Sequence, residues 1–203
     1  MGGKKKKVLR AEMKRVLSNF DERWVNAASG EICQRLSRLI ADLPFEVEHV
    51  LAWASFFPGE VDLSRFIEQG LESYSIYLPR VLEDCSMTYV SIGSDWLESS
   101  QPGVFGVPEP TNDSGEIFML ENAASTVVLV PGMAFDRRGN RLGRGKGCYD
   151  RFLCRPGMSE AATIGVGFSL QIAREVPTDS HDVLMNWICT EDEAFACVAI
   201  EGE

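Results

Sequence analysis

The segment 141–152 combines the residue types that bind a polyphosphate. It reads RLGRGKGCYDRF, so glycines alternate with basic residues ahead of an aromatic and acidic run. Glycines let backbone N–H groups turn inward around an anion, and basic side chains add full positive charges. Lysine binds phosphate as a point charge, whereas arginine can hold two oxygens. The predicted phosphate ligands are Arg141, Gly143, Arg144, Gly145, Lys146 and Gly147; the alternative is a mobile surface loop with solvated charges.

Neither common glycine-rich nucleotide motif fits this segment. A P-loop requires GxxxxGK followed by Ser or Thr, but Asn140 stands where its first glycine would be and Gly147 follows Lys146. The dinucleotide fingerprint requires GxGxxG directly after a strand, whereas the glycines here are spaced GxGxG. The segment is therefore a different kind of anion-binding loop.

Several carboxylates follow predicted strands or the glycine loop. Asp150 and Asp182 could hold Mg²⁺ beside a phosphate, because Mg²⁺ sites use one or two carboxylates with phosphate oxygens. Asp150 could instead complement a helix dipole. Asp136 is a third metal candidate, although DRRG also fits an ordinary turn. Glu60 could bind an amino-bearing ring or cap the next helix, and we favour binding because Asp62 is the expected cap.

The composition limits the function classes. The chain has 203 residues and a formal net charge of −10, which argues against binding bulk nucleic acid. It has no apolar run long enough to span a membrane and no apolar segment behind MGGKKKK that would make a secretory signal. The lysine run 4–7 fits a solvated terminus, and an RNA-associated role is the alternative. Six cysteines without a CxxC pair and two distant histidines indicate reduced thiols rather than a zinc site.

We therefore expect a single domain over residues 1–203 that is cytoplasmic and monomeric. Its expected partner is a small-molecule substrate, with no nucleic acid and no membrane.

Hydrophobic periodicity predicts alternating helices and strands. Helices are expected over 5–20, from Asp21 to about Pro44, after Asp62 and from Tyr149. Strands are expected over 50–57, 75–78, 87–92, 125–130 and 163–168, with edge strands over 187–189 and 196–200. Segments 98–116 and 131–146 are expected to be loops. This order predicts an α/β three-layer sandwich with a largely parallel central sheet and flanking helices.

Ligands of such sheets bind beyond the carboxyl ends of the strands. Two segments follow predicted central strands and carry chemistry: FFPGE at 56–60, and the long segment 131–146 that leads into the glycine loop. Both segments therefore qualify as ligand-binding loops.

The whole chain resembles the 5-formyltetrahydrofolate cyclo-ligase family. The stretch 129–153, LVPGMAFDRRGNRLGRGKGCYDRFL, closely resembles the family's signature. Further motifs occur in the family's order: KKVLR at 6–10, PGEVD at 58–62, LPR at 78–80, GVFGVPEP at 103–110 and segments 165–168 and 176–183. Each is weak alone, but together they are strong because their order and spacing agree.

The resemblance implies an ATP- and Mg²⁺-dependent conversion of 5-formyltetrahydrofolate to 5,10-methenyltetrahydrofolate. ATP would phosphorylate the formyl oxygen, and N10 of the folate would then displace phosphate. A non-catalytic folate- or nucleotide-binding relative is the alternative.

The resemblance also implies roles for individual residues. Arg144 and Lys146 match the positions nearest the transferred phosphate, and Asp150 and Asp182 match the Mg²⁺ ligands. The ATP-binding positions are Lys6, Lys7, Arg10, Arg141, Gly143, Gly145, Gly147 and Tyr149. The folate-binding positions are Ser55, Glu60, Phe105, Arg144 and Cys148.

Two residues depart from the family's pattern. Cys148 stands where the family has the first of two tyrosines, so a stacking or hydroxyl contact is missing there. Asn186 stands where the family often has a second C-terminal aspartate, which predicts weaker Mg²⁺ binding if that carboxylate helps the metal. The tail after Asp192 matches no feature of the family.

Overall fold

The computed structural model describes residues 2–111 and 115–197. Its α-helices are α1 (Gly2–Leu17), α2 (Glu22–Ala41), α3 (Ser64–Gly70), α4 (Trp96–Ser99) and α5 (Cys148–Leu153). Its 3-10 helices are η1 (Leu120–Ser125), η2 (Met158–Glu160) and η3 (Ser169–Gln171). Its strands are β1 (His49–Leu51), β2 (Ser75–Val81), β3 (Met87–Ser91), β4 (Ser100–Pro102), β5 (Pro108–Pro110), β6 (Thr126–Pro131), β7 (Ala134–Phe135), β8 (Arg141–Leu142), β9 (Ala162–Val166), β10 (Trp187–Cys189) and β11 (Ala194–Ala196).

A mixed sheet of seven strands forms the centre, in the order β11-β10-β9-β6-β1-β2-β3. The inner pairs are parallel, and the outer pairs β2–β3 and β10–β11 are antiparallel. The central strands read as continuous apolar runs because both faces of the sheet are covered; every residue of β9 is buried. The predicted α/β class with a largely parallel sheet is confirmed.

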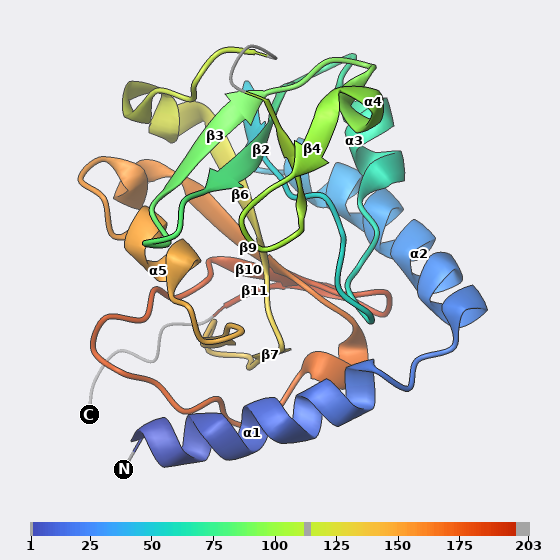
Figure 1. Cartoon of the computed structure of the whole chain (residues 1–203), viewed down its shortest axis with the longest axis vertical. Helices are drawn as coiled ribbons and strands as arrows, with labels where there is room; N and C mark the ends of the chain where they lie inside the picture. Colours follow the sequence, from blue (N-terminus) through green and yellow to red (C-terminus); the bar gives the residue numbers. More distant parts are fainter. Residues whose placement is uncertain (1, 112–114, 198–203) are drawn as a thin grey trace.

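Helices cover the two faces of the sheet (Figure 1). One core cluster joins α2 and α3 to the strands through residues such as Ile32, Leu36 and Phe66. The other joins α5 and η2 to the opposite face through Phe152 and Met158. Asp21 starts α2 by accepting a hydrogen bond from the Trp24 N–H at 3.0 Å, as predicted for the N-cap. The result is the expected three layers.

Helix α1 lies across one end of the molecule instead of on a sheet face (Figure 1). Its apolar side, with Met13 and Leu17, packs against Met133, Leu142 and Val176. Met133 directly precedes β7 and Leu142 belongs to β8, so α1 is fixed beside the segment that carries the glycine loop.

Three predicted segments in the first 146 residues differ from the observed structure. The strand expected over 50–57 ends at Leu51, because the N–H groups of Phe56 and Phe57 turn toward the Glu60 carboxylate. Segment 98–116 is not only a loop: it contains the end of α4 and a β4–β5 hairpin, which tolerates its prolines because it is a short two-stranded sheet. Segment 131–146 likewise contains the β7–β8 hairpin.

The C-terminal strands also shift. Strand β10 pairs on both sides, so it is not an edge strand, and the edge strand β11 begins at Ala194 rather than Ala196. Positions 198–200 of the expected last strand lie outside the described residues. The expected cap Asp62 is wrong in detail: Leu63 occupies the N-cap of α3, while the Asp62 carboxylate accepts the Ser64 N–H at 2.9 Å.

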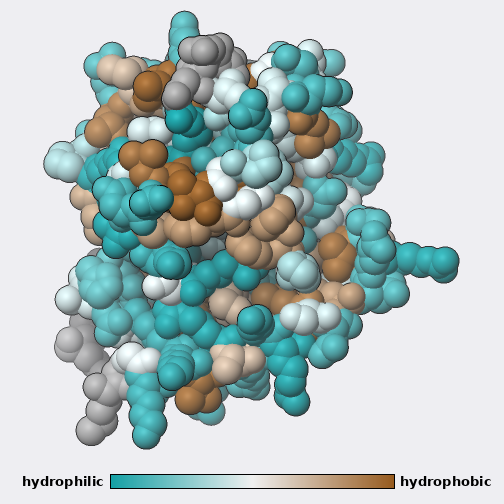
Figure 2. All heavy atoms as spheres, viewed as in Figure 1, coloured by the Kyte–Doolittle hydropathy of each residue, from teal (hydrophilic) through white to brown (hydrophobic). Residues whose placement is uncertain are grey.

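In the view of Figure 2 the surface is mainly hydrophilic, and exposed hydrophobic residues form small separate groups. Among the described residues, none of the helices has the length and apolarity that a membrane span requires.

Candidate active site

A cavity of about 600 Å³ lies at the carboxyl ends of β1, β2 and β6. The chain runs from β1 to β2 on one side, and β6 pairs with β1 on the other. Strand order therefore reverses between β1 and β6, which is where open α/β sheets bind their ligands. Trp53 and Ala54 follow β1, and Pro131 and Gly132 end or follow β6; all line the cavity. Both loops singled out from the sequence contribute residues to this cavity.

Most of the predicted site residues line this one cavity. From α1 come Lys6 and Arg10, and from the loop after β1 comes Glu60. The hairpin β4–β5 contributes Phe105 at its tip, and the loop before β10 contributes Asp182. From the glycine loop and α5 come Arg141, Gly143, Arg144, Gly145, Lys146, Gly147, Cys148, Tyr149 and Asp150.

The glycine loop is held in place by backbone contacts. Gly145 and Gly147 have φ angles of 105° and 71°, which only glycine adopts without strain. The Arg10 Nε donates to the Gly143 carbonyl at 2.9 Å, which joins the loop to α1. The Arg151 guanidinium donates to the Lys146 carbonyl at 2.9 Å and to the Asp84 carbonyl at 3.3 Å. These contacts favour an ordered loop over a mobile one.

Two arginines of the loop, Arg141 and Arg144, are paired with carboxylates of the same cavity. Arg141 is buried, and its guanidinium contacts Asp150 Oδ1 at 2.9 Å. Its Nε is buried and has no hydrogen-bond partner within the described part of the chain. Because an unpaired buried donor is costly, this atom is suited to a ligand oxygen such as that of a phosphate.

Lys6 is buried instead of solvated, which corrects the expectation for part of the lysine run. Its Nζ lies 2.8 Å from Asp179 Oδ2 and also contacts Asp182 Oδ2. Burial alone would lower the pKa of Lys6, but the two aspartates raise it above its usual value, and Lys6 lowers the pKa of Asp179. This ion-pair group fixes the start of α1 over the cavity.

Arg144 and Glu60 join the glycine loop to the loop after β1. Their closest contact is 3.1 Å, and the Arg144 guanidinium also lies 4.0 Å from the centroid of the Phe57 ring. The other Glu60 oxygen accepts the N–H groups of Phe56 and Phe57 at 3.1 and 3.0 Å. Both oxygens of Glu60 are therefore engaged before any ligand binds.

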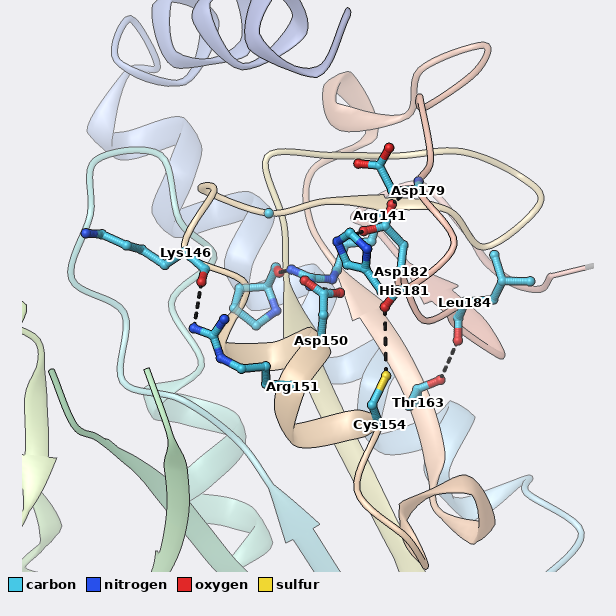
Figure 3. Close-up of polar contacts among 12 residues, drawn as sticks. Arg141, Lys146, Asp150, Arg151, Cys154, Thr163, Asp179, His181, Asp182 and Leu184 are labelled. Carbon is cyan, nitrogen blue, oxygen red and sulfur yellow. Dashed lines mark hydrogen bonds and ion pairs between the residues drawn. The ribbon is translucent and has the colours of Figure 1, made fainter. Parts of the chain in front are cut away.

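Figure 3 shows Asp150 on α5 and Asp182 on its loop near Arg141, while the Lys146 side chain extends away from them. Lys146 Nζ lies 5.4 Å from the centroid of the Phe105 ring. The cavity thus has an acidic group at Asp150 and Asp182, and a basic and aromatic group at Arg144, Lys146 and Phe105.

No cluster of three or more His, Cys, Asp or Glu among the described residues could bind a metal by itself. Asp150 and Asp182 supply the kind of oxygen ligands that Mg²⁺ shares with phosphate, so the residues fit a metal that arrives with a polyphosphate. Asn186 lies outside this group: its Oδ1 accepts the N–H and hydroxyl of Thr163 at 2.7 and 2.8 Å. The asparagine at this position, where the family often has an aspartate, therefore joins the segment before β10 to β9 and does not contact the cavity.

Asp136 organises a turn and does not line the cavity. Its buried carboxylate accepts the backbone N–H groups of Arg138, Asn140 and Val176, and the Asn140 side-chain amide. Of the two roles considered for it, the structure supports the turn.

Asp136→Asn should lower the free energy of unfolding by about 2 to 4 kcal/mol, because an amide cannot accept all these hydrogen bonds and charge-assisted ones are the strongest. The free energy of unfolding is measured by urea denaturation monitored by circular dichroism. The exposed Asp42 provides the control: Asp42→Asn should change stability by less than about 0.5 kcal/mol. Equal stability of the two variants would show that the Asp136 charge contributes nothing to the turn.

Cys148 lies at the cavity wall beside Cys85, which is buried in the turn between β2 and β3. Burial and the neighbouring Cys85 thiol raise the pKa of Cys148 to about 12. A thiol with such a pKa is protonated at neutral pH and reacts slowly with alkylating agents. The Cys148 side chain, which replaces the tyrosine of the family pattern, thus lies next to the Cys85 thiol.

Iodoacetamide at pH 7.5 should therefore label the exposed Cys154 well before Cys148. Peptide mapping by mass spectrometry gives the order of labelling, and a Cys154→Ser variant shows the next cysteine to react. Labelling of Cys148 should accelerate as the pH rises toward 12, since only the thiolate reacts. Equal labelling rates for the two cysteines at pH 7.5 would contradict the raised pKa of the half-buried Cys148 thiol.

The structure does not bring Lys7 and Ser55 into the cavity lining. Lys7 is exposed on α1, and the Ser55 hydroxyl donates to Asp62 at 3.5 Å. Other lining residues were not singled out from the sequence, and they include Trp53, Phe57, Pro79, Val81, Met87, Val107, Glu109, Asp179 and His181. Some of them fall inside quoted motifs, such as Pro79 in LPR and Glu109 in GVPEP, which is the signal that could have identified them.

The fold and cavity define an α/β protein that places a basic glycine loop and paired carboxylates beside an apolar pocket at a topological switch point. The model of the 5-formyltetrahydrofolate cyclo-ligase family matches residues 3–191. The chain belongs to this family of enzymes.

Individual relatives agree with the family match. A 5-formyltetrahydrofolate cyclo-ligase of Saccharomyces cerevisiae is 27% identical over 92% of this chain and 95% of its own. One from Haemophilus influenzae is 25% identical over 90% of this chain and 96% of its own. The solved structure of a 5,10-methenyltetrahydrofolate synthetase from Aquifex aeolicus superimposes with a TM-score of 0.76 and 28% identity, covering 98% of this chain and 94% of that one.

Proposed function

We propose that this chain converts 5-formyltetrahydrofolate to 5,10-methenyltetrahydrofolate with consumption of ATP. The observation that carries the proposal is the shared cavity: the basic glycine loop and the apolar pocket line the same space. Relatives named for this reaction match nearly the whole chain. A phosphoryl group held by the loop can therefore be presented directly to a ring held in the pocket.

The reaction balances with the groups that the cavity offers. The formyl oxygen attacks the γ-phosphorus of ATP, the bond to the bridging oxygen breaks, and ADP leaves. N10 of the folate then attacks the activated formyl carbon and loses its proton. The C–O bond breaks with release of inorganic phosphate, which leaves the methenyl bridge between N5 and N10. The protein contributes positioning and charge stabilisation rather than a covalent intermediate.

The basic residues would hold the phosphates. Arg144 and Lys146 would stabilise the charge on the transferred group, because fixed cations act where charge develops in the transition state. Arg141, with its unpaired Nε, and the backbone N–H groups of the glycine loop would hold the other phosphates. Lys6 and Arg10 would bring α1 over the nucleotide. Mg²⁺ bound by Asp150 and Asp182 would neutralise phosphate charge.

Binding of both substrates would exchange ion-pair partners inside the cavity. Without ligand, Glu60 is paired with Arg144 and Asp150 with Arg141. Phosphate oxygens compete for both arginines, so ATP releases Glu60 for the folate and Asp150 for the metal. In the ligand-free protein these two ion pairs neutralise the charges of the arginines and carboxylates. The cavity therefore avoids the free-energy cost of an unpaired buried charge before the ligands bind.

A spectrophotometric assay tests the proposal. Protein, 5-formyltetrahydrofolate, Mg²⁺ and ATP should together generate the absorbance of the methenyl product, and omission of ATP should abolish it. No product at saturating ATP, with folate still bound in a calorimeter, would support the non-catalytic binding protein instead.

A further inference from the structure

Glu109 is a buried carboxylate in the apolar part of the cavity. It lies on β5, is 8% exposed, and its Oε2 accepts the Val81 N–H at 3.2 Å. Pro79, Met87 and Val107 line the same part of the cavity. Burial raises the pKa of Glu109 above its usual value, although the Val81 N–H and the charge of Arg80 oppose this. The surroundings are therefore short of the donors that a carboxylate requires.

The β4–β5 hairpin holds this carboxylate on one side. A Cβ atom on Gly103 would lie 2.1 Å from Glu109 Cδ, so a side chain at position 103 would displace the Glu109 carboxylate. The Gly103 N–H donates to the Val107 carbonyl at 2.8 Å, which fixes the glycine against the acid. With hairpin backbone on one side and β2 on another, the carboxylate can gain further hydrogen bonds from the cavity.

Trp53 supplies the complementary group. Its side chain lines the same cavity and is 4% exposed, and its Nε1 has no hydrogen-bond partner in the described part of the chain. Indole N–H can only donate, and a buried donor without a partner is destabilising. The cavity is thus lined by a carboxylate with unused acceptor capacity and by a tryptophan whose buried indole N–H has no partner among the described residues.

Glu60 is less suited to the same task in the ligand-free protein. Its oxygens already accept hydrogen bonds from Phe56, Phe57 and Arg144. It also lies beside the glycine loop, where the phosphoryl group is expected. The two glutamates of the cavity therefore face different chemistry: Glu60 the reacting end, Glu109 the apolar end.

We propose that Glu109 and Trp53 recognise the 2-amino-4-oxo edge of the pterin ring and so set the orientation of the folate. The inference rests on the proposed function. The Glu109 carboxylate accepts hydrogen bonds from the ring N3–H and the 2-amino group, a donor pair that matches two carboxylate oxygens. The Trp53 N–H donates to an acceptor of the ring, such as the 4-oxo group. The apolar side chains between them contact the ring faces, and N5 and N10 then lie toward Arg144 and Lys146.

Two conservative variants test this assignment. Glu109→Gln keeps the size of the side chain and the acceptor for the Val81 N–H, but it turns an amide donor toward the pterin ring. Trp53→Phe removes only the indole N–H and part of the indole ring. Calorimetry without ATP should show 5-formyltetrahydrofolate binding weakened about tenfold to a hundredfold by Glu109→Gln and about threefold to tenfold by Trp53→Phe. Binding of Mg²⁺–ATP should be unchanged in both, and thermal unfolding should show both folded.

A folate analogue with a methyl group in place of the 2-amino group completes the test. The wild-type protein should bind it less tightly than 5-formyltetrahydrofolate, whereas Glu109→Gln should discriminate much less between the two. Full discrimination by Glu109→Gln, or equal loss of folate and ATP affinity, would overturn the assignment. Failure of the wild-type protein to bind any folate would instead overturn the proposed function, so the two failures are distinguishable.

Discussion

Lys146→Ala should lower kcat by about a hundredfold to a thousandfold, as expected when one donor that stabilises transition-state charge is removed. Lys146 is exposed at the cavity, and its recorded side-chain contact is the Phe105 ring at 5.4 Å. Its side chain is thus free to move to a phosphate, and its loss removes little packing. We expect the free energy of unfolding to change by less than about 0.5 kcal/mol.

Steady-state kinetics with both substrates and a urea unfolding curve measure these effects together. The exposed Lys5 of α1, which does not line the cavity, provides the matched control, and Lys5→Ala should leave kcat unchanged. Lys146→Arg keeps the charge and should recover part of the rate. A kcat of Lys146→Ala near the wild-type value would remove Lys146 from the reaction, and a rate loss that follows a loss of stability would make its role structural.

Glu60→Ala should weaken 5-formyltetrahydrofolate binding by about tenfold to a hundredfold and leave ATP affinity equal or slightly higher. The reason is the ion pair between Glu60 and Arg144 at 3.1 Å. Removing Glu60 frees Arg144 for phosphate but deprives the folate of a carboxylate. Calorimetric titrations with each substrate alone separate the two effects.

Glu60→Gln is the control for the loop itself, because its amide oxygen can still accept the N–H groups of Phe56 and Phe57. It should unfold like the wild-type protein and still bind folate poorly, since only the charge is lost. Unchanged folate affinity in both variants would remove Glu60 from the substrate site, and a large loss of ATP affinity would mean that Glu60 supports the glycine loop rather than the folate.

The layers of the fold could be predicted because buried strands and helices leave recognisable patterns of apolar residues in the sequence. The run TVVLV of β6 is apolar on both faces, and the buried side of α2 repeats with the helical period. The elements that were missed are hairpins of two- and three-residue strands. Such short strands carry no periodic signal, and the prolines at 102, 108 and 110 conceal β4–β5.

Residues of the candidate site could be predicted from the sequence where the residue type alone indicates the role. They could not be predicted where the role depends on a contact that forms only on folding. Glycines and cations in one short segment indicate anion binding without knowledge of the fold. The pairing of Lys6 with Asp182 joins residues 176 positions apart, and only the docking of α1 creates it. Trp53 and Glu109 were missed because a tryptophan inside a predicted strand and a glutamate between prolines resemble ordinary core and loop residues when the cavity is not known.

The most direct test of the central claim, phosphorylation of the formyl oxygen, follows that oxygen atom. 5-Formyltetrahydrofolate labelled with ¹⁸O in the formyl group is incubated with protein, Mg²⁺ and unlabelled ATP, and the inorganic phosphate is analysed by mass spectrometry. The proposed reaction transfers one ¹⁸O to phosphate for each methenyl product formed. Methenyl product accompanied by unlabelled phosphate would contradict it, because the formyl oxygen would then leave as water.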